Sequence, residues 1–256
     1  MRTIRTLLPN LITAIGMLLG VWAIFSAVRG GYENAAWLLV ACVVVDKLDG
    51  TAARLLRASS PMGIQMDSLS DVTTFVVAPA VVWAGALTDP GSPFHLAPRI
   101  LIPYGAASVY VAAGAFRLAR FNCEASEGLY PHHFNGLPTT MAGAINMTLF
   151  LTLSRHLPVA AYAGWIPGVL LVLAVLMVSG LQLPKLRKSR SRAMNAFTLV
   201  NLVLVVPLIL LRWYPEYLLL LALGYAVVGF SWARWVDPPA RAGDPAASRE
   251  EAPPPD

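Results

Sequence analysis

The chain has 256 residues, of which 57% are hydrophobic and 13% are charged, and its mean hydropathy is +0.61. This composition excludes an ordinary water-soluble domain and predicts a protein with several membrane spans. The net charge of +5 does not indicate a nucleic-acid partner, because the basic residues lie next to apolar stretches, where anionic lipid headgroups attract them.

Apolar stretches recur along the chain at lengths that suit membrane-spanning helices. We expect an all-α polytopic bundle of about eight transmembrane helices. They lie near residues 7–28, 34–56, 63–88, 98–118, 137–155, 160–182, 196–211 and 214–235. The last twenty residues contain six prolines, so we expect a membrane domain over 1–236 and a disordered cytoplasmic tail over 237–256.

Lysine and arginine are unevenly distributed in an eight-span arrangement that has both termini on one side. That side holds fifteen of the nineteen basic residues, and the other side holds only Arg29, Arg99, Arg155 and Arg212. Positively charged loops tend to stay in the cytoplasm. We therefore expect an inner-membrane protein whose termini and acidic site face the cytoplasm.

Four aspartates lie in the second and third apolar stretches. One helix face carries Asp46, Asp49, Gly50, Ala53 and Arg54. A second face carries Gly63, Asp67 and Asp71. An aspartate near the centre of a membrane helix costs about 2.5–3.5 kcal/mol, so four unpartnered ones would strongly oppose insertion. They must share a cation or a watery cavity.

A short break containing Pro61 separates the two faces, so the two helices can converge as a hairpin. Four carboxylates would then offer up to about eight oxygens to a hard divalent cation, which suits Mg²⁺ or Mn²⁺. The small residues among the acids leave space for a flat or phosphorylated group to approach the backbone. An acidic cluster that serves helix packing or ion conduction is the alternative interpretation.

The spacing of these residues resembles the signature of the CDP-alcohol phosphatidyltransferase family. In this chain it reads Asp46-x2-Asp49-Gly50-x2-Ala53-Arg54-x8-Gly63-x3-Asp67-x3-Asp71. The resemblance implies a membrane enzyme of that fold and a homodimer. It implies that Asp46, Asp49 and Asp67 hold the Mg²⁺ or Mn²⁺, while Asp71 contributes to the metal site and serves as the catalytic base.

The same resemblance implies CDP-diacylglycerol as the donor. Pro9, Asn10 and Thr13 suit a helix start, and a similar Pro-Asn-x-x-Thr segment lies beside the nucleotide site in that family. The residues expected to bind the donor are Asn10, Thr13, Gly50, Ala53, Arg54 and Gly63.

Arg117 and Arg120 share a helix face at the predicted end of the fourth span, and Asn122 follows them. Arginine binds phosphate or carboxylate bidentately, although the pair could also be interfacial anchors. The segments Arg-Leu-Ala-Arg-Phe-Asn (117–122) and Phe-Asn-Gly-Leu-Pro (134–138) resemble the branch of the family that uses L-serine. This implies that all three residues contact the acceptor.

The resemblance therefore implies transfer of the phosphatidyl group from CDP-diacylglycerol to L-serine, giving phosphatidylserine and CMP among membrane lipids. Another acceptor, such as glycerol phosphate, inositol phosphate or choline, would keep the aspartates and alter the region 117–138. An ion or proton transporter would explain intramembrane carboxylates, but it would not explain the glycine and alanine spacing or the pairing with Arg54.

Overall fold

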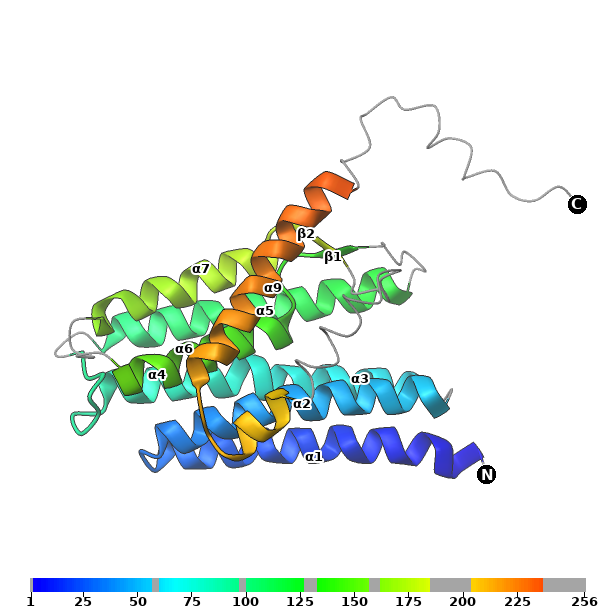
Figure 1. Ribbon diagram of the computed structural model, residues 1–256, viewed down its shortest axis with the longest axis horizontal. Helices are drawn as coiled ribbons and strands as arrows, with labels where there is room; N and C mark the ends of the chain where they lie inside the picture. The colour runs from blue at the N-terminus through cyan, green and yellow to red at the C-terminus, as the bar shows by residue number, and fades with distance from the viewer. Residues whose placement is uncertain are drawn as a thin grey trace, which may run out of the picture.

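The computed structural model describes residues 2–56, 60–96, 100–126, 133–156, 162–184 and 204–236 as a bundle of long helices (Figure 1). The helices are α1 (Arg2–Val28), α2 (Tyr32–Leu56), α3 (Pro61–Asp71), a π-helical turn (Val72–Val77), α4 (Ala78–Thr88), α5 (Leu101–Ser126), α6 (Thr139–His156), α7 (Ile166–Val178) and α9 (Pro215–Val236). A 3₁₀ turn, Ala163–Trp165, precedes α7, and residues 204–210 are helical. Because α3, the π turn and α4 are continuous, the described helical segments number about eight, as predicted.

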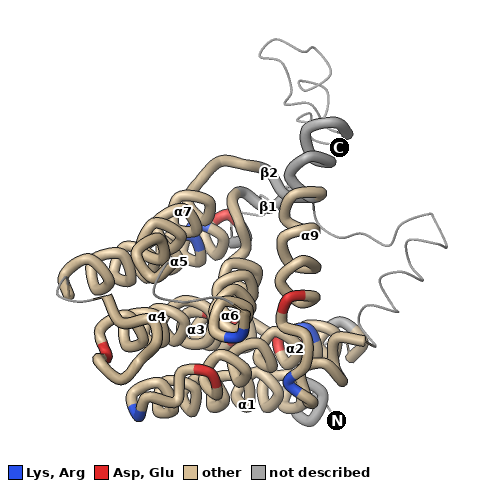
Figure 2. The backbone as a smooth tube through the Cα atoms, turned by 60° about the vertical axis from the view of Figure 1, so that its left-hand side comes forward, with Lys and Arg blue, Asp and Glu red and all other residues tan. Residues whose placement is uncertain are grey.

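Three helical stretches are long and apolar enough to cross a membrane, namely Leu7–Val28, Pro61–Thr88 and Leu101–Glu124. Ala163–Val178 and Pro215–Val228 are shorter apolar helices. Figure 2 shows that α1 and α7 carry neither acidic nor basic residues over most of their length. The predicted all-α membrane bundle is confirmed. The tail over 237–256 lies outside the described residues, so the domain boundary stays a prediction.

Helix α5 extends beyond the span expected at 98–118. It ends at Ser126, so that Arg117, Arg120 and Asn122 all lie on its last turns. Hydropathy marks only the apolar part of a helix, whereas the polar residues after Leu118 continue the same backbone hydrogen bonding. The three predicted acceptor contacts are therefore held on one rigid element.

The start of α3 explains how the second acidic face is positioned. Ser60 is the N-cap, and its Oγ accepts a hydrogen bond from the backbone N–H of Gly63 at 3.0 Å. Pro61 occupies the first turn, where its missing N–H costs nothing. Both α2 and α3 pack more extensively on α1 than on each other. The two acidic faces can therefore face each other across a gap.

A π-helical turn follows Asp71 directly, and its backbone is held by neighbouring helices. Glycines from three helices approach its residues Thr74, Phe75 and Val76: Gly20 of α1, Gly114 of α5 and Gly143 of α6. The hydroxyl of Tyr110 donates to the carbonyl oxygen of Phe75 at 2.9 Å. π turns widen a helix locally and occur frequently at functional sites. Here the turn and its packing fix how α3 presents Asp71.

The replacement Gly143→Ala is expected to destabilise the protein by about 1–3 kcal/mol, which is typical of overpacking. A Cβ at Gly143 would lie 2.9 Å from the Cβ and 3.0 Å from the Cα of Phe75, so α6 or the π turn must move. Gly168→Ala is the matched control, because a Cβ at Gly168 meets no atom within 4 Å. Thermal unfolding in detergent should show a lower midpoint for Gly143→Ala alone. Equal midpoints in the two variants would contradict this packing.

The segment before α6 is fixed by a short β-ribbon. Strand β1 (His133–Asn135) pairs antiparallel with β2 (Gln182–Pro184), and Phe134 lies opposite Leu183. Gly136 has φ +77°, and a Cβ there would clash with the carbonyl oxygen of Met177. Its N–H donates to the carbonyl of Leu181 at 2.7 Å. Only glycine fits this position, and the turn sets where α6 begins.

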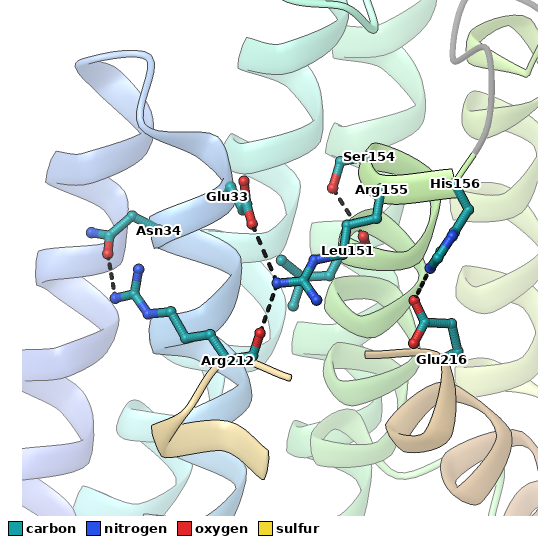
Figure 3. A network of polar contacts seen from close by, with 8 residues as sticks. All are labelled: Glu33, Asn34, Leu151, Ser154, Arg155, His156, Arg212 and Glu216. Atoms are coloured by element: carbon teal, nitrogen blue, oxygen red, sulfur yellow. Dashed lines mark hydrogen bonds and ion pairs between the residues drawn. The ribbon is translucent and has the colours of Figure 1, made fainter. Parts of the chain in front are cut away.

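A polar network joins the start of α2 and the end of α6 to the segment around the start of α9 (Figure 3). Its charged and polar members are Glu33, Asn34, Arg155, His156, Arg212 and Glu216. Arg155 Nη2 lies 4.0 Å from Glu33 Oε1 and donates to the carbonyl of Arg212 at 2.7 Å. The Arg212 side chain donates to Asn34 Oδ1 at 2.7 Å, and His156 contacts Glu216. The network thus ties α2 and α6 to the start of α9.

Candidate active site

Three of the four aspartates meet at one point. Asp46 and Asp49 on α2 and Asp67 on α3 each place a carboxylate oxygen so that the three oxygens lie within 4.8 Å of one another. Asp49 is buried, Asp46 is partly buried and Asp67 is exposed. The predicted convergence of the two acidic faces is therefore observed. Such a set of hard oxygen ligands fits Mg²⁺ or Mn²⁺, and no softer ligand belongs to the cluster among the described residues.

Helix α1 supplies the polar groups beside this cluster. Thr13 Oγ1 donates to Asp49 Oδ2 at 2.9 Å and also lies 3.1 Å from the carbonyl oxygen of Pro9. Asn10 packs over Gly63, where a Cβ would lie 3.0 Å from Asn10 Oδ1. Asn10 and Thr13, the two residues of α1 that are predicted to bind CDP-diacylglycerol, therefore both lie at the acidic site. Thr13 has a further effect, because its hydroxyl holds the buried carboxylate of Asp49 in one orientation.

The remaining predicted donor residues follow Asp49 on α2. Gly50 and Ala53 are half-buried and lie on the same helix, within about one turn of Asp49. Arg54 belongs to α2 as well, but its side chain lies outside the described part of the chain. The exposed Lys47 places its Nζ 3.9 Å from Asp46 Oδ2. Because the Lys47 side chain is 68% exposed, solvent screens its charge, so Lys47 does not neutralise the cluster.

Asp71 lies one turn beyond Asp67 but has different neighbours. Its Oδ2 lies 3.5 Å from Thr139 Oγ1, and it is not among the three aspartates grouped within 4.8 Å. It lines a small cavity together with Asp46 and Asp49, but not Asp67. The lining residues are Gly16, Cys42, Asp46, Asp49, Ser70, Asp71, Thr74 and Phe75. Asp71 thus lies close to the cluster of three aspartates, while its own carboxylate is held by the neutral hydroxyl of Thr139.

The two arginines of α5 point to different places. Arg117 is buried, with 6% of its surface exposed, and its Nη1 donates to Thr139 Oγ1 at 3.4 Å. Arg120 donates to the carbonyl oxygens of Val178 at 3.2 Å and Ser179 at 3.5 Å. A cation at the C-terminus of a helix is favourable, so Arg120 fastens α5 to the end of α7. The structure brings Arg117 to Thr139, which also contacts Asp71.

Asn122 is joined to the second acidic helix. Its Nδ2 donates to Ser68 Oγ at 2.9 Å, and Ser68 lies on α3 next to Asp67. Ser68 Oγ also lies 3.1 Å from the carbonyl oxygen of Ile64. The end of α5 is therefore attached to α3 at Ser68, the residue that follows Asp67.

A family model described as CDP-alcohol phosphatidyltransferase matches residues 6–180, which is more than half of the chain. The chain belongs to the CDP-alcohol phosphatidyltransferase family. The match extends from α1 past the end of α7 and includes every site residue described above. The resemblance drawn from the aspartate spacing is confirmed.

Individual relatives of this CDP-alcohol phosphatidyltransferase family member agree with that assignment. The chain is 34% identical over 208 residues to the CDP-diacylglycerol--serine O-phosphatidyltransferase of Helicobacter pylori (strain J99), covering 79% of this chain and 83% of that protein. It is 32% identical over 181 residues to the protein of the same name from Bacillus subtilis, covering 71% and 92%. It is 30% identical over 180 residues to the archaetidylserine synthase of Methanothermobacter thermautotrophicus, covering 70% of each.

Two site residues of this family member were missed by sequence reasoning. Thr139 contacts both Arg117 and Asp71, and Ser68 binds Asn122. Thr139 directly follows the Phe-Asn-Gly-Leu-Pro segment, and Ser68 directly follows Asp67, so both lay beside motifs that were recognised. Their contacts join residues 22–68 positions apart along α3, α5 and α6, which no local pattern encodes.

Proposed function

We propose that this protein transfers the phosphatidyl group of CDP-diacylglycerol to L-serine, forming phosphatidylserine and releasing CMP. The observation that carries the proposal is the cluster of three carboxylates within 4.8 Å, with Asp71 and the buried Arg117 beside it. Membership of the family supports the donor. The relatives named CDP-diacylglycerol--serine O-phosphatidyltransferase support the acceptor.

In this proposal, Asp46, Asp49 and Asp67 hold Mg²⁺ or Mn²⁺. A divalent cation bound there offsets the charge of the donor diphosphate and stabilises CMP as a leaving group. Thr13 keeps Asp49 oriented through its 2.9 Å hydrogen bond. The donor head is received by Asn10 and Thr13 of α1, Gly50, Ala53 and Arg54 of α2, and Gly63 of α3.

Asp71 acts as the base in the transfer step. The serine hydroxyl oxygen forms a bond to the phosphorus that carries diacylglycerol, and the bond from this phosphorus to the bridging diphosphate oxygen breaks. The electron pair of that bond leaves with CMP, and the hydroxyl proton passes to Asp71. Because Asp71 is held by Thr139 and lies outside the three-carboxylate group, it can accept a proton while the other aspartates keep their charge.

The acceptor is held from the side of α5. A buried arginine suits the carboxylate of serine or the transferring phosphate, because its planar fork binds two oxygens at once. The contact of Arg117 with Thr139, which also contacts Asp71, supports this role. Arg120 and Asn122 remain in the proposed acceptor set, and their contacts to α7 and α3 support a role in shaping the pocket wall.

The cellular setting is part of the proposal. The acyl chains of the donor remain in the bilayer while its CDP head reaches the acidic cluster. The distribution of lysine and arginine supports an inner-membrane protein with its site and both termini toward the cytoplasm. We also propose a homodimer and no nucleic-acid partner.

With purified protein and CDP-diacylglycerol, L-serine is expected to support CMP release far better than glycerol phosphate, inositol phosphate or choline. Serine offers both a hydroxyl to attack and a carboxylate for Arg117. The measurement is the initial rate of CMP release with each acceptor, together with the mass of the lipid product. If serine is inert while another alcohol is consumed, the donor assignment stands and the acceptor assignment is wrong.

A further inference from the structure

Thr139 lies between the side chains of Arg117, which is proposed to bind the acceptor, and Asp71, the proposed base. Arg117 Nη1 donates to its Oγ1 at 3.4 Å, and the same hydroxyl donates to Asp71 Oδ2 at 3.5 Å. Thr139 is fully buried, with 0% of its surface exposed. A hydroxyl has one proton to donate and lone pairs to accept, so it can serve a cation on one side and a carboxylate on the other.

This use of a threonine differs from that of its neighbours on α6. Thr148 and Thr152 turn back to carbonyl oxygens of their own helix, at 2.7 Å from Ala144 and 2.8 Å from Thr148. Such back-bonding is the ordinary choice of a threonine inside an apolar helix. Thr139 is the first residue of α6, and its hydroxyl instead reaches α5 and α3.

The position of Thr139 is itself closely determined. The backbone N–H of Leu137 donates to the carbonyl of Leu176 at 2.9 Å. Gly136 has a positive φ, and its backbone lies directly against the carbonyl oxygen of Met177. On the opposite side, the π turn after Asp71 is packed against Gly143 of the same helix, α6. Both ends of the Thr139–Asp71 contact are thus anchored by backbone packing.

We propose that Thr139 is a positioning residue for the transfer reaction. Its hydroxyl orients the Asp71 carboxylate toward the acceptor and holds the Arg117 guanidinium in a fixed position relative to that carboxylate. The inference rests on the proposed function, in which Asp71 takes the proton and Arg117 holds the acceptor. Without the hydroxyl, the guanidinium and the carboxylate lose their shared partner in a buried site. Asp71 is then free to turn toward Arg117 or toward the three-carboxylate cluster, and away from the attacking hydroxyl.

The test uses the full-length protein in detergent with CDP-diacylglycerol and L-serine. Thr139→Val removes the hydroxyl at nearly constant volume, and it is expected to lower kcat about 10- to 100-fold, in line with the loss of a hydrogen bond to a charged group. The KM for CDP-diacylglycerol should change by less than about threefold. Thr139→Ser keeps the hydroxyl and is expected to retain kcat within about threefold of wild type.

Thr148→Val is the matched control, because Thr148 is equally buried on the same helix and bonds only to it in the described residues. Its kcat should equal that of wild type. Thr139→Ala is assayed in parallel, so that a hydroxyl-free variant is still measured if valine disturbs folding. Wild-type kcat in either hydroxyl-free variant overturns the proposal, as does a Thr139→Ser variant that is as slow as Thr139→Val.

Failure of the proposed function gives a different result. If wild-type protein does not use serine, the acceptor assignment fails in the wild-type assay alone. The ratio between each Thr139 variant and wild type is then measured with the acceptor that the protein does use, and the same ratios decide the role of Thr139.

Discussion

Asp71→Asn is expected to lower the single-turnover rate of CMP release by about 10²- to 10⁴-fold, the usual contribution of a positioned acid or base. Asparagine preserves the size of the side chain and can still contact Thr139, but it cannot take the proton of the attacking hydroxyl. Because Asp46, Asp49 and Asp67 keep their grouping without Asp71, CDP-diacylglycerol affinity should change little. The measurement pairs donor binding with single-turnover CMP release.

Asp89→Asn serves as the matched control for this change. Asp89 follows α4 at the other end of the same continuous helix, where its Oδ2 accepts a hydrogen bond from the Tyr32 hydroxyl at 3.0 Å. It should leave both donor binding and turnover unchanged. A near-wild-type single-turnover rate in Asp71→Asn would reject the base assignment, and a loss of donor affinity equal to that of Asp67→Asn would make Asp71 chiefly a metal ligand.

Asp67→Asn is expected to weaken divalent-cation binding and CDP-diacylglycerol binding together, each by at least about tenfold. The change removes one of the three negative ligands, and the donor diphosphate depends on the cation that they hold. Calorimetry with Mn²⁺, in the presence and absence of donor, measures both affinities. Asp67 is exposed and lies on the rim of the cluster, so the folded state should tolerate the change.

The comparison with Asp71→Asn makes this second experiment specific. The two aspartates lie one turn apart on α3, so a general disturbance of that helix would affect both variants alike. Asp67→Asn should lose donor affinity, whereas Asp71→Asn should lose the chemical step. Unchanged cation and donor affinities in Asp67→Asn would remove Asp67 from the proposed metal site.

The acidic faces could be predicted from the sequence because their information is local. The spacing from Asp46 to Asp49 and from Asp67 to Asp71 places each pair on one face, and Pro61 marks the break between the helices. The membrane helices could be predicted for the same reason, since hydropathy is summed over neighbouring residues. The observed bundle and the converging carboxylates follow both predictions.

The partners of these residues could not be predicted in the same way. Asp71 and Thr139 are 68 positions apart, and the packing of α6 against the π turn that follows Asp71 brings them together. The π turn after Asp71 leaves no mark in an apolar pattern that reads as one continuous helix. The spacing of Arg117 and Arg120 places them on one helix face. Arg120 nevertheless binds the end of α7, because the terminal carbonyl groups of α7 need hydrogen-bond donors.

The central claim is tested most directly by following labelled L-serine into lipid while CMP is measured in the same reaction. Purified full-length protein, CDP-diacylglycerol and Mn²⁺ or Mg²⁺ should yield one mole of phosphatidylserine for each mole of CMP, and chelation of the cation should stop both. The contradicting result is CMP release without incorporation of serine into lipid, or no CMP release at all from protein that is folded and supplied with cation.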